Sequence, residues 1–136
     1  MDIGTSMLIA ASGMRAQSAR MRTIAENIAN ANSTAATPGG DPYRRKIATM
    51  VPSFDSELNA TTVTAGKPMA DMSDFRMKYD PGNPAADKQG YVKLPNVNSL
   101  VEIMDMREAQ SSYEANLNVL DASKTMMSRT IDLLTK

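Results

Sequence analysis

Two long apolar stripes at helical spacing, one at each end of the chain, constrain the fold more than any other feature of this sequence. The first stripe advances by alternating steps of four and three residues, and its members are Ile3, Met7, Ala10, Met14, Gln17, Met21, Ile24, Ile28 and Ala31. The second stripe has the same spacing, and its members are Ile103, Met106, Gln110, Tyr113, Leu117, Leu120, Lys124, Met127, Ile131 and Leu134. Each stripe predicts a helix that packs against another helix.

The predicted helices are long for a chain of 136 residues. At a rise of about 1.5 Å per residue, the first would extend roughly 45 Å and the second, starting near Ser99, roughly 55 Å. A compact domain of this length has a radius of gyration of only about 14 Å. We therefore expect the helices to pair as an antiparallel coiled coil that protrudes, and to become fully ordered only when other chains cover them.

Between the helices lies a segment of a different character. Short strands are expected over residues 43–51, 61–65, 73–79 and 90–94, and prolines separate them. With about 60 residues, such a segment forms a domain that is marginal by itself and leans on the helices. The sequence thus predicts an α+β chain with an N-terminal axial helix over 1–32, a small β-rich middle domain over 33–95 and a C-terminal axial helix over 96–136.

Both junctions carry capping signals. Asn27, Asn30 and Asn32 crowd the end of the first helix, where asparagine tolerates the left-handed cap conformation. At the start of the second helix, Ser99 and Glu102 have the spacing of a capping box. Asn96 and Asn98 are alternative caps for that helix.

The sequence has little to offer for catalysis, cofactors or metals. It contains no His and no Cys, so the commonest general base, thiol nucleophile and soft metal ligands are missing. Asp80 and Asp87 flank a turn and lack the alternate oxygen ligands of a calcium loop. Asp71 and Asp74 have no partner acid nearby in the sequence. We therefore expect no catalytic, cofactor-binding or metal site.

Charge and hydropathy narrow the possible partners. Fifteen basic residues balance fifteen acidic ones, so the chain has no long-range attraction for nucleic acid. The basic run from Arg44 to Lys46 alternates between the faces of an expected strand, which favours an ordinary edge strand with charged residues or, as a second interpretation, a subunit contact. No stretch is long and apolar enough to predict a transmembrane segment. The uncharged residues 3–14 belong to the first stripe and follow Asp2, so we do not expect a cleaved signal peptide there.

Methionine and glutamine give the stripes particular properties. Five of the 12 Met are stripe members, where their flexible side chains suit either irregular core gaps or contacts with several different neighbours. Polar residues such as Gln17 and Gln110 within an apolar seam are typical of positions that fix helix register. For Lys124, exposure with a snorkelling stem is an equal alternative.

The residues at 11–17 and 25–32 resemble the amino-terminal signature shared by bacterial flagellar rod and hook proteins. Four more blocks, at 42–46, 79–87, 90–98 and 112–116, resemble a proximal rod protein of the flagellar basal body. Together the blocks span nearly the whole chain. The segment 33–41 departs from the family, because many rod relatives have only a short turn there.

This resemblance implies a structural protein. It implies export without a cleaved signal peptide by the flagellar type III export apparatus, and helical assembly with itself and other flagellar rod subunits into the torque-transmitting shaft that crosses the periplasm. On this interpretation the stripe residues, other than Ala31 and Lys124, form the subunit interface. The alternative from a different functional class is a cytosolic helical adaptor or chaperone-like module that binds one partner helix through the stripes.

Overall fold

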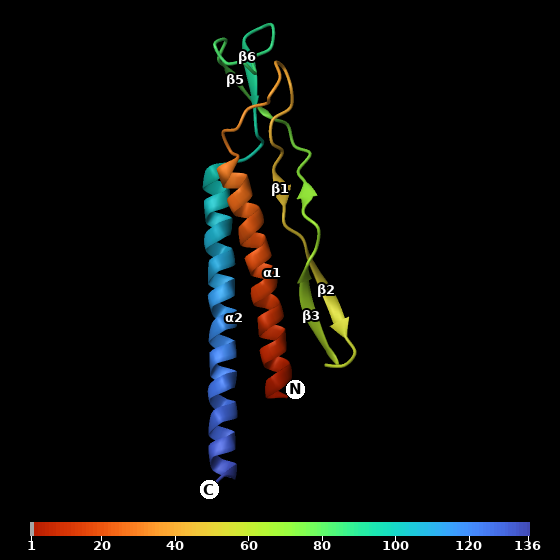
Figure 1. The fold of residues 1–136 in the computed structure, drawn as a ribbon, viewed down its shortest axis with the longest axis vertical. Coiled ribbons are helices and arrows are strands. Elements are labelled where there is room, and N and C mark those ends of the chain that lie inside the picture. The colour runs from red at the N-terminus through yellow and green to blue at the C-terminus, as the bar shows by residue number, and fades with distance from the viewer. Residues whose placement is uncertain (1) are drawn as a thin grey trace. The chain divides into compact units, whose positions relative to one another are not determined.

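A computed structural model describes residues 2–136 (Figure 1). In chain order the elements are α1 (Ile3–Ala29), β1 (Lys46–Ile47), β2 (Met50–Asp55), β3 (Ala60–Ala65), β4 (Met69–Ala70), β5 (Arg76–Tyr79), β6 (Tyr91–Leu94) and α2 (Ser99–Leu134). The strands form three antiparallel pairs, β1 with β4, β2 with β3 and β5 with β6. The predicted α+β class, with two terminal helices that pair and a small β-rich middle, is confirmed.

The chain forms two compact units. The first consists of the chain up to Met21, Thr49–Lys67 and Arg107–Lys136, and the second consists of Arg22–Ala48 and Pro68–Met106. Each unit therefore contains a stretch of both helices together with strands from the middle of the sequence.

In the first unit, the β2–β3 hairpin lies beside α1 (Figure 1). The backbone N–H of Val63 in β3 donates to Oγ of Ser12 in α1, at 3.3 Å, so it points away from β2. Val63 stands directly opposite Pro52. In an antiparallel ladder such a pair turns its backbone groups outward on both strands. Pro52, which has no N–H, therefore occupies an outward-facing position on the free edge of β2.

In the second unit, β5 and β6 form a hairpin whose long loop ends at Gly90. The Oδ1 of Asp87 accepts hydrogen bonds from the backbone N–H groups of Gln89 and Tyr91, and the N–H of Asp80 donates to the carbonyl of Gly90. The interpretation of Asp80 and Asp87 as turn residues is thus supported. Gly90 has φ of 87°, a conformation that costs little only for glycine.

The strand predictions were correct in outline and imprecise in detail. The expected strand over 43–51 divides into β1 and β2, and residues 43–45 lie outside both. The two-residue strand β4 was not predicted, because a pair of residues has no detectable alternation. Tertiary contacts hold residues 43–45 outside a strand, as described below.

The end of α1 differs from the expectation. Among the described residues, Asn59 is the only non-glycine with positive φ, so neither Asn30 nor Asn32 adopts the predicted left-handed cap. The helix instead closes with tight turns, in which the N–H of Ala31 bonds to the carbonyl of Ile28. The amide of Asn30 donates to the carbonyl of Glu26 within the helix.

The start of α2 at Ser99 is as predicted, and the cap is Asn98, one of the two expected alternatives to Ser99. Its Oδ1 accepts a hydrogen bond from the N–H of Leu100 at 3.1 Å. The capping box between Ser99 and Glu102 is wrong as an assignment, because the Glu102 side chain is buried and bonded to Arg45 and Asn27.

Candidate functional site: exposed helix faces and a polar junction

In the first unit, α1 and α2 approach closely through small side chains. A Cβ added to Gly13 would lie 2.8 Å from Nδ2 of Asn116. Arg20 forms an ion pair with Glu108 at 3.2 Å. Because a later residue of α1 thus contacts an earlier residue of α2, the two helices run antiparallel. Ala109 is fully buried on α2, and Ala16 is nearly so on α1. Small residues allow this approach because larger side chains would hold the helix axes further apart.

The α1 stripe faces inward as predicted. Every member from Ile3 to Ala31 is buried or half-buried, and Ala10, Ile24 and Ala31 are the most shielded.

The prediction for α2 needs a correction. Its buried face contains Glu102, Ala109 and Ser123, with Ser112 and Asn116 half-buried. Of the predicted stripe, the half-buried members are Met106, Tyr113 and Leu120, whereas the exposed members are Ile103, Gln110, Leu117, Lys124, Met127, Ile131 and Leu134. The face toward α1 is thus rotated from the apolar stripe, because close approach selects small and polar residues there. The role of the stripe residues in a subunit interface stays a prediction.

The last part of α2 extends beyond α1. Because Gly13 lies beside Asn116, the start of α1 at Ile3 falls opposite roughly residue 126. All residues from 124 to 136 are exposed. We call residues 124–134 the α2 extension. Its exposed large apolar side chains are Met126, Met127, Ile131, Leu133 and Leu134.

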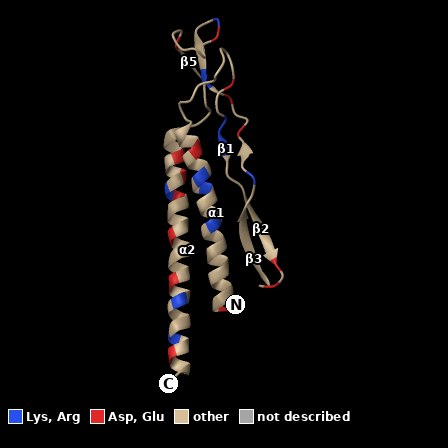
Figure 2. Cartoon of the chain, in the orientation of Figure 1, with Lys and Arg blue, Asp and Glu red and all other residues tan. Residues whose placement is uncertain are grey.

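Charge is mixed on this extension. Lys124, Arg129 and Asp132 are interspersed with the apolar residues, and Figure 2 shows both signs along the end of α2. A surface of this kind lacks a strong field of one sign, so its apolar side chains are the main source of affinity for a partner.

Gln17 is the polar member of the α1 stripe. Within the described residues, its Oε1 is buried and has no hydrogen-bond partner. An unsatisfied buried acceptor costs about 1–3 kcal/mol. The predicted role of Gln17 in fixing register therefore lacks a supporting hydrogen bond within the described chain.

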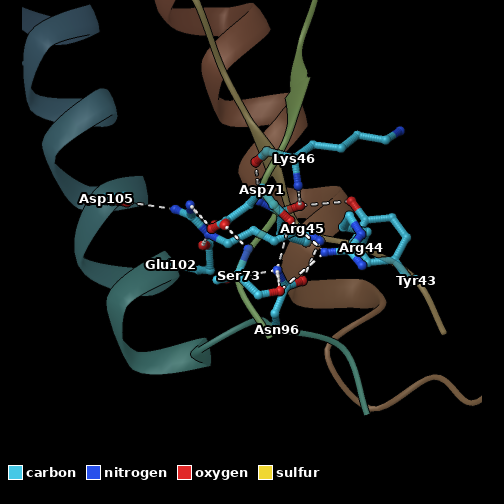
Figure 3. A network of polar contacts seen from close by, with 10 residues as sticks. Tyr43, Arg44, Arg45, Lys46, Asp71, Ser73, Asn96, Glu102 and Asp105 are labelled. Carbon is cyan, nitrogen blue, oxygen red and sulfur yellow. Dashed lines mark hydrogen bonds and ion pairs between the residues drawn. The ribbon is translucent and has the colours of Figure 1, made fainter. Parts of the chain in front are cut away.

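The second unit contains a polar junction, defined here as Asn27, Tyr43, Arg45, Lys46, Asp71, Asn96 and Glu102 (Figure 3). Asn27 of α1 is fully buried. Its Oδ1 accepts hydrogen bonds from the Tyr43 hydroxyl at 2.7 Å and the Lys46 N–H at 3.0 Å. Its Nδ2 donates to the Lys46 carbonyl at 2.8 Å and to the Glu102 carboxylate at 3.0 Å. All four hydrogen-bonding positions of this amide are occupied.

Glu102 connects α2 to the same segment. Its Oε1 accepts a hydrogen bond from Nε of Arg45 at 2.5 Å. The Arg45 guanidinium also lies 3.3 Å from Asp71 and 3.8 Å from Asp105. Three carboxylates therefore surround one half-buried cation, and Figure 3 shows them converging on it. Such pairing is what permits a glutamate to be almost completely buried.

Asn96, just before α2, completes the junction. Its Oδ1 accepts from the backbone N–H of Arg45 at 2.8 Å, and its Nδ2 donates to the carbonyl of Asp71 at 3.0 Å. Next to it, the Arg44 guanidinium lies 4.2 Å from the centre of the Phe75 ring. The basic run therefore has specific partners. The interpretation as a charged edge strand is wrong for Arg44 and Arg45, because only Lys46 of the run belongs to a strand.

The polar junction also shifts the pKa values of three of its side chains. Hydrogen bonds from the backbone and side chain of Ser73, with a smaller contribution from Arg45, lower the pKa of Asp71 despite partial burial. Burial lowers the pKa of Arg45, but its interactions with Glu102 and Asp71 outweigh this effect and leave it raised. Burial is the main cause of the raised pKa of Tyr43. Arg45 is thus held charged and Tyr43 neutral at neutral pH.

Over residues 2–136, no group of three or more His, Cys, Asp or Glu side chains is arranged to hold a metal ion. Within the same residues, neither helix is long and apolar enough to cross a lipid bilayer.

Sequence reasoning missed the roles of Asn27, Arg45 and Glu102. One signal was available for Asn27, because it lies between Ile24 and Ala31 at steps of three and four and so belongs to the inner face of the helix. A polar residue at such a position needs buried partners. The partners themselves lie up to 75 positions away in the chain, and no local pattern identifies them.

Comparisons with known proteins agree with this architecture. Residues 7–36 match the family described as flagella basal body rod protein, and residues 88–133 match the family described as flagellar basal body rod FlgEFG protein C-terminal. These two segments contain most of α1 and α2.

Individual relatives cover nearly the whole chain. The chain is 52% identical to flagellar basal-body rod protein FlgC of Agrobacterium fabrum over 93% of its own length and 91% of the relative. It is 38% identical to the FlgC protein of Aquifex aeolicus over 97% of each chain. It is 36% identical to the FlgC protein of Bacillus subtilis over 94% of its own length and 95% of the relative.

Proposed function

The chain belongs to the FlgC family of flagellar basal-body rod proteins, as a structural subunit of the rod, and we propose that it polymerises through its terminal helices into a torque-transmitting shaft. Its partners in this assembly are other rod subunits and copies of itself. The shaft crosses the periplasm, and the subunit reaches it through the flagellar type III export apparatus without loss of a signal peptide. Its role is mechanical, with no catalytic step, cofactor or nucleic acid.

The α2 extension is the observation that best supports this proposal. Exposed apolar patches of this kind are typical of protein–protein contacts. The column formed by Met106, Tyr113 and Leu120 is half-buried beside α1 and continues as Met127 and Leu134, which are exposed. Earlier in α2 this column packs beside α1. A helix from a neighbouring subunit would pack in the same way on the exposed part of the column.

A head-to-tail contact of this type generates an open helical array, because the surface offered differs from the surface received. The predicted interface residues of both stripes would supply the contacts: those of α1 within the helix pair, and those exposed on α2 between subunits. Many such contacts acting in parallel would make a shaft stiff. The alternative of a cytosolic adaptor is not favoured, because similarity to rod proteins extends over nearly the whole chain.

The test is electron microscopy of the full chain at high concentration, alone and with other rod subunits. We expect filaments or ordered aggregates from the unmodified chain and their loss in Ile131→Asp, which places a charge among the exposed apolar side chains of the α2 extension. Ser128→Asp is the matched control, because Ser128 is also exposed but lies on the polar side of the helix with Arg129 and Asp132. Filaments from Ile131→Asp, or a defined small complex from the unmodified chain, would contradict the proposal.

A further inference from the structure

We infer that Asn27 is a positioning residue that makes the order of segment 43–46 dependent on pairing of the two helices. The inference rests on the geometry of the polar junction, and its consequence for the rod rests on the proposed function. It assigns to one buried amide the task of holding the start of the β-rich middle against the helix pair.

The first observation is how Asn27 binds Lys46. The Asn27 amide accepts from the N–H and donates to the carbonyl of the same residue. A neighbouring strand would make the same pair of bonds. On its other side the segment pairs with β4, and the N–H of Asp71, which follows β4, donates to the carbonyl of Arg45. Asn27 therefore replaces a strand on the side of the segment that faces α1.

The second observation is that both helices take part. The remaining N–H of Asn27 donates to Glu102 of α2, and Glu102 also accepts from Arg45. Arg45 and Lys46 are thus held by one side chain from each helix. Separating the helices would break the Asn27–Glu102 hydrogen bond, and the segment could then keep Asn27 or Glu102 as a partner but not both.

It follows that segment 43–46 has a fixed conformation only in a chain whose helices are paired. A subunit with unpaired helices would lack an ordered connection between α1 and the strands. In the rod, the direction in which the middle leaves the helices would then be determined by the helix pair. A buried asparagine that merely fills space has no such coupling.

The experiment measures hydrogen exchange of individual backbone amides by NMR in the full chain. The helix pair is closed independently of the junction by Gly13→Cys with Asn116→Cys, since a Cβ at position 13 would lie 3.1 Å from Cγ of Asn116 and the natural chain has no cysteine. In this oxidised chain we expect Asn27→Ala to accelerate exchange of the Lys46 amide about tenfold or more, with the helix amides unchanged. Asn30→Ala is the control, because Asn30 bonds only within its own helix end.

Substitutions that swap the polar groups at positions 27 and 102 test whether the Asn27–Glu102 hydrogen bond holds the segment. Asn27→Asp should accelerate Lys46 exchange at least as much as Asn27→Ala, because its second oxygen faces the Glu102 carboxylate. Adding Glu102→Gln restores a donor toward position 27 and should slow that exchange at least threefold.

Equal Lys46 exchange in the oxidised parent and in Asn27→Ala would overturn the inference, as would no recovery in the double variant. Because exchange is measured in the isolated chain, a failure of rod assembly does not affect this result, and the two proposals fail separately.

Discussion

Asn27 of α1 donates a hydrogen bond to the Glu102 carboxylate of α2 at 3.0 Å, and both side chains are shielded from solvent. This pair connects residues 75 positions apart in the sequence. It also connects to Arg45 and Lys46, so a change in one member leaves polar groups of several others unsatisfied.

Glu102→Ala should destabilise the folded chain by about 2–4 kcal/mol, because it leaves Arg45 and the Asn27 amide without a buried acceptor. Urea denaturation followed by circular dichroism measures the change. Glu108→Ala is the control, since Glu108 also pairs with an arginine but its side chain is 67% exposed. Such an exposed pair contributes about 0–1 kcal/mol. Equal losses for the two variants would show that burial of Glu102 has no energetic importance.

Acid should weaken the fold partly through Asp71. Its pKa is lowered in the folded state, so it binds fewer protons there than in the unfolded chain. The contribution of Asp71 to the free energy of unfolding is therefore complete above the unfolded-state pKa of about 4. It is lost as the pH falls through the lowered folded-state pKa. We expect the unfolding free energy of the unmodified chain to fall more steeply below about pH 4 than that of Asp71→Asn. Parallel curves from urea titrations at several pH values would rule this out.

Gly90→Ala should lower stability by about 1–2 kcal/mol, because its φ of 87° disfavours a side chain and the new Cβ would lie 2.9 Å from Cε2 of Tyr79. Thermal denaturation should show a midpoint several degrees lower. Gly82→Ala is the control, since the nearest atom to its added Cβ is at 4.0 Å and its φ is not positive. A similar decrease of the midpoint in both variants would show that the effect comes from replacing any glycine and not from the conformation of Gly90.

Gln17→Met should stabilise the free chain by about 1 kcal/mol, because it removes a buried acceptor that has no partner among the described residues and keeps a similar volume. Gln110→Met, at an exposed stripe position, should change stability by less than about 0.5 kcal/mol. Chemical denaturation of the two variants gives the comparison. A destabilised Gln17→Met chain would indicate that the glutamine has a stabilising contact in solution.

The terminal helices could be predicted from the sequence because the signal is local. Steps of three and four residues define α1, and the start of α2 at Ser99 agrees with the expectation. The face of α2 could not be predicted from hydrophobicity alone. Closely packed helices select residues such as Ala109 and Ser123, whereas Ile131 and Leu134 remain exposed.

The junction could not be predicted for a different reason. The local pattern around Arg45 resembles an edge strand, and the one around Glu102 resembles a helix cap. Each side chain acquires its actual partner only through the tertiary fold, where contacts between distant segments outweigh local preference. The subunit interface and the three-part division of the chain remain predictions.

Pro52 has a consequence for subunits that accumulate before they assemble. It stands on the open edge of β2, where a strand from another molecule would need a donor that proline lacks. Runaway stacking of hairpins into cross-β fibrils is thereby disfavoured on that side. At high concentration, self-association of these molecules is therefore favoured through contacts between helices.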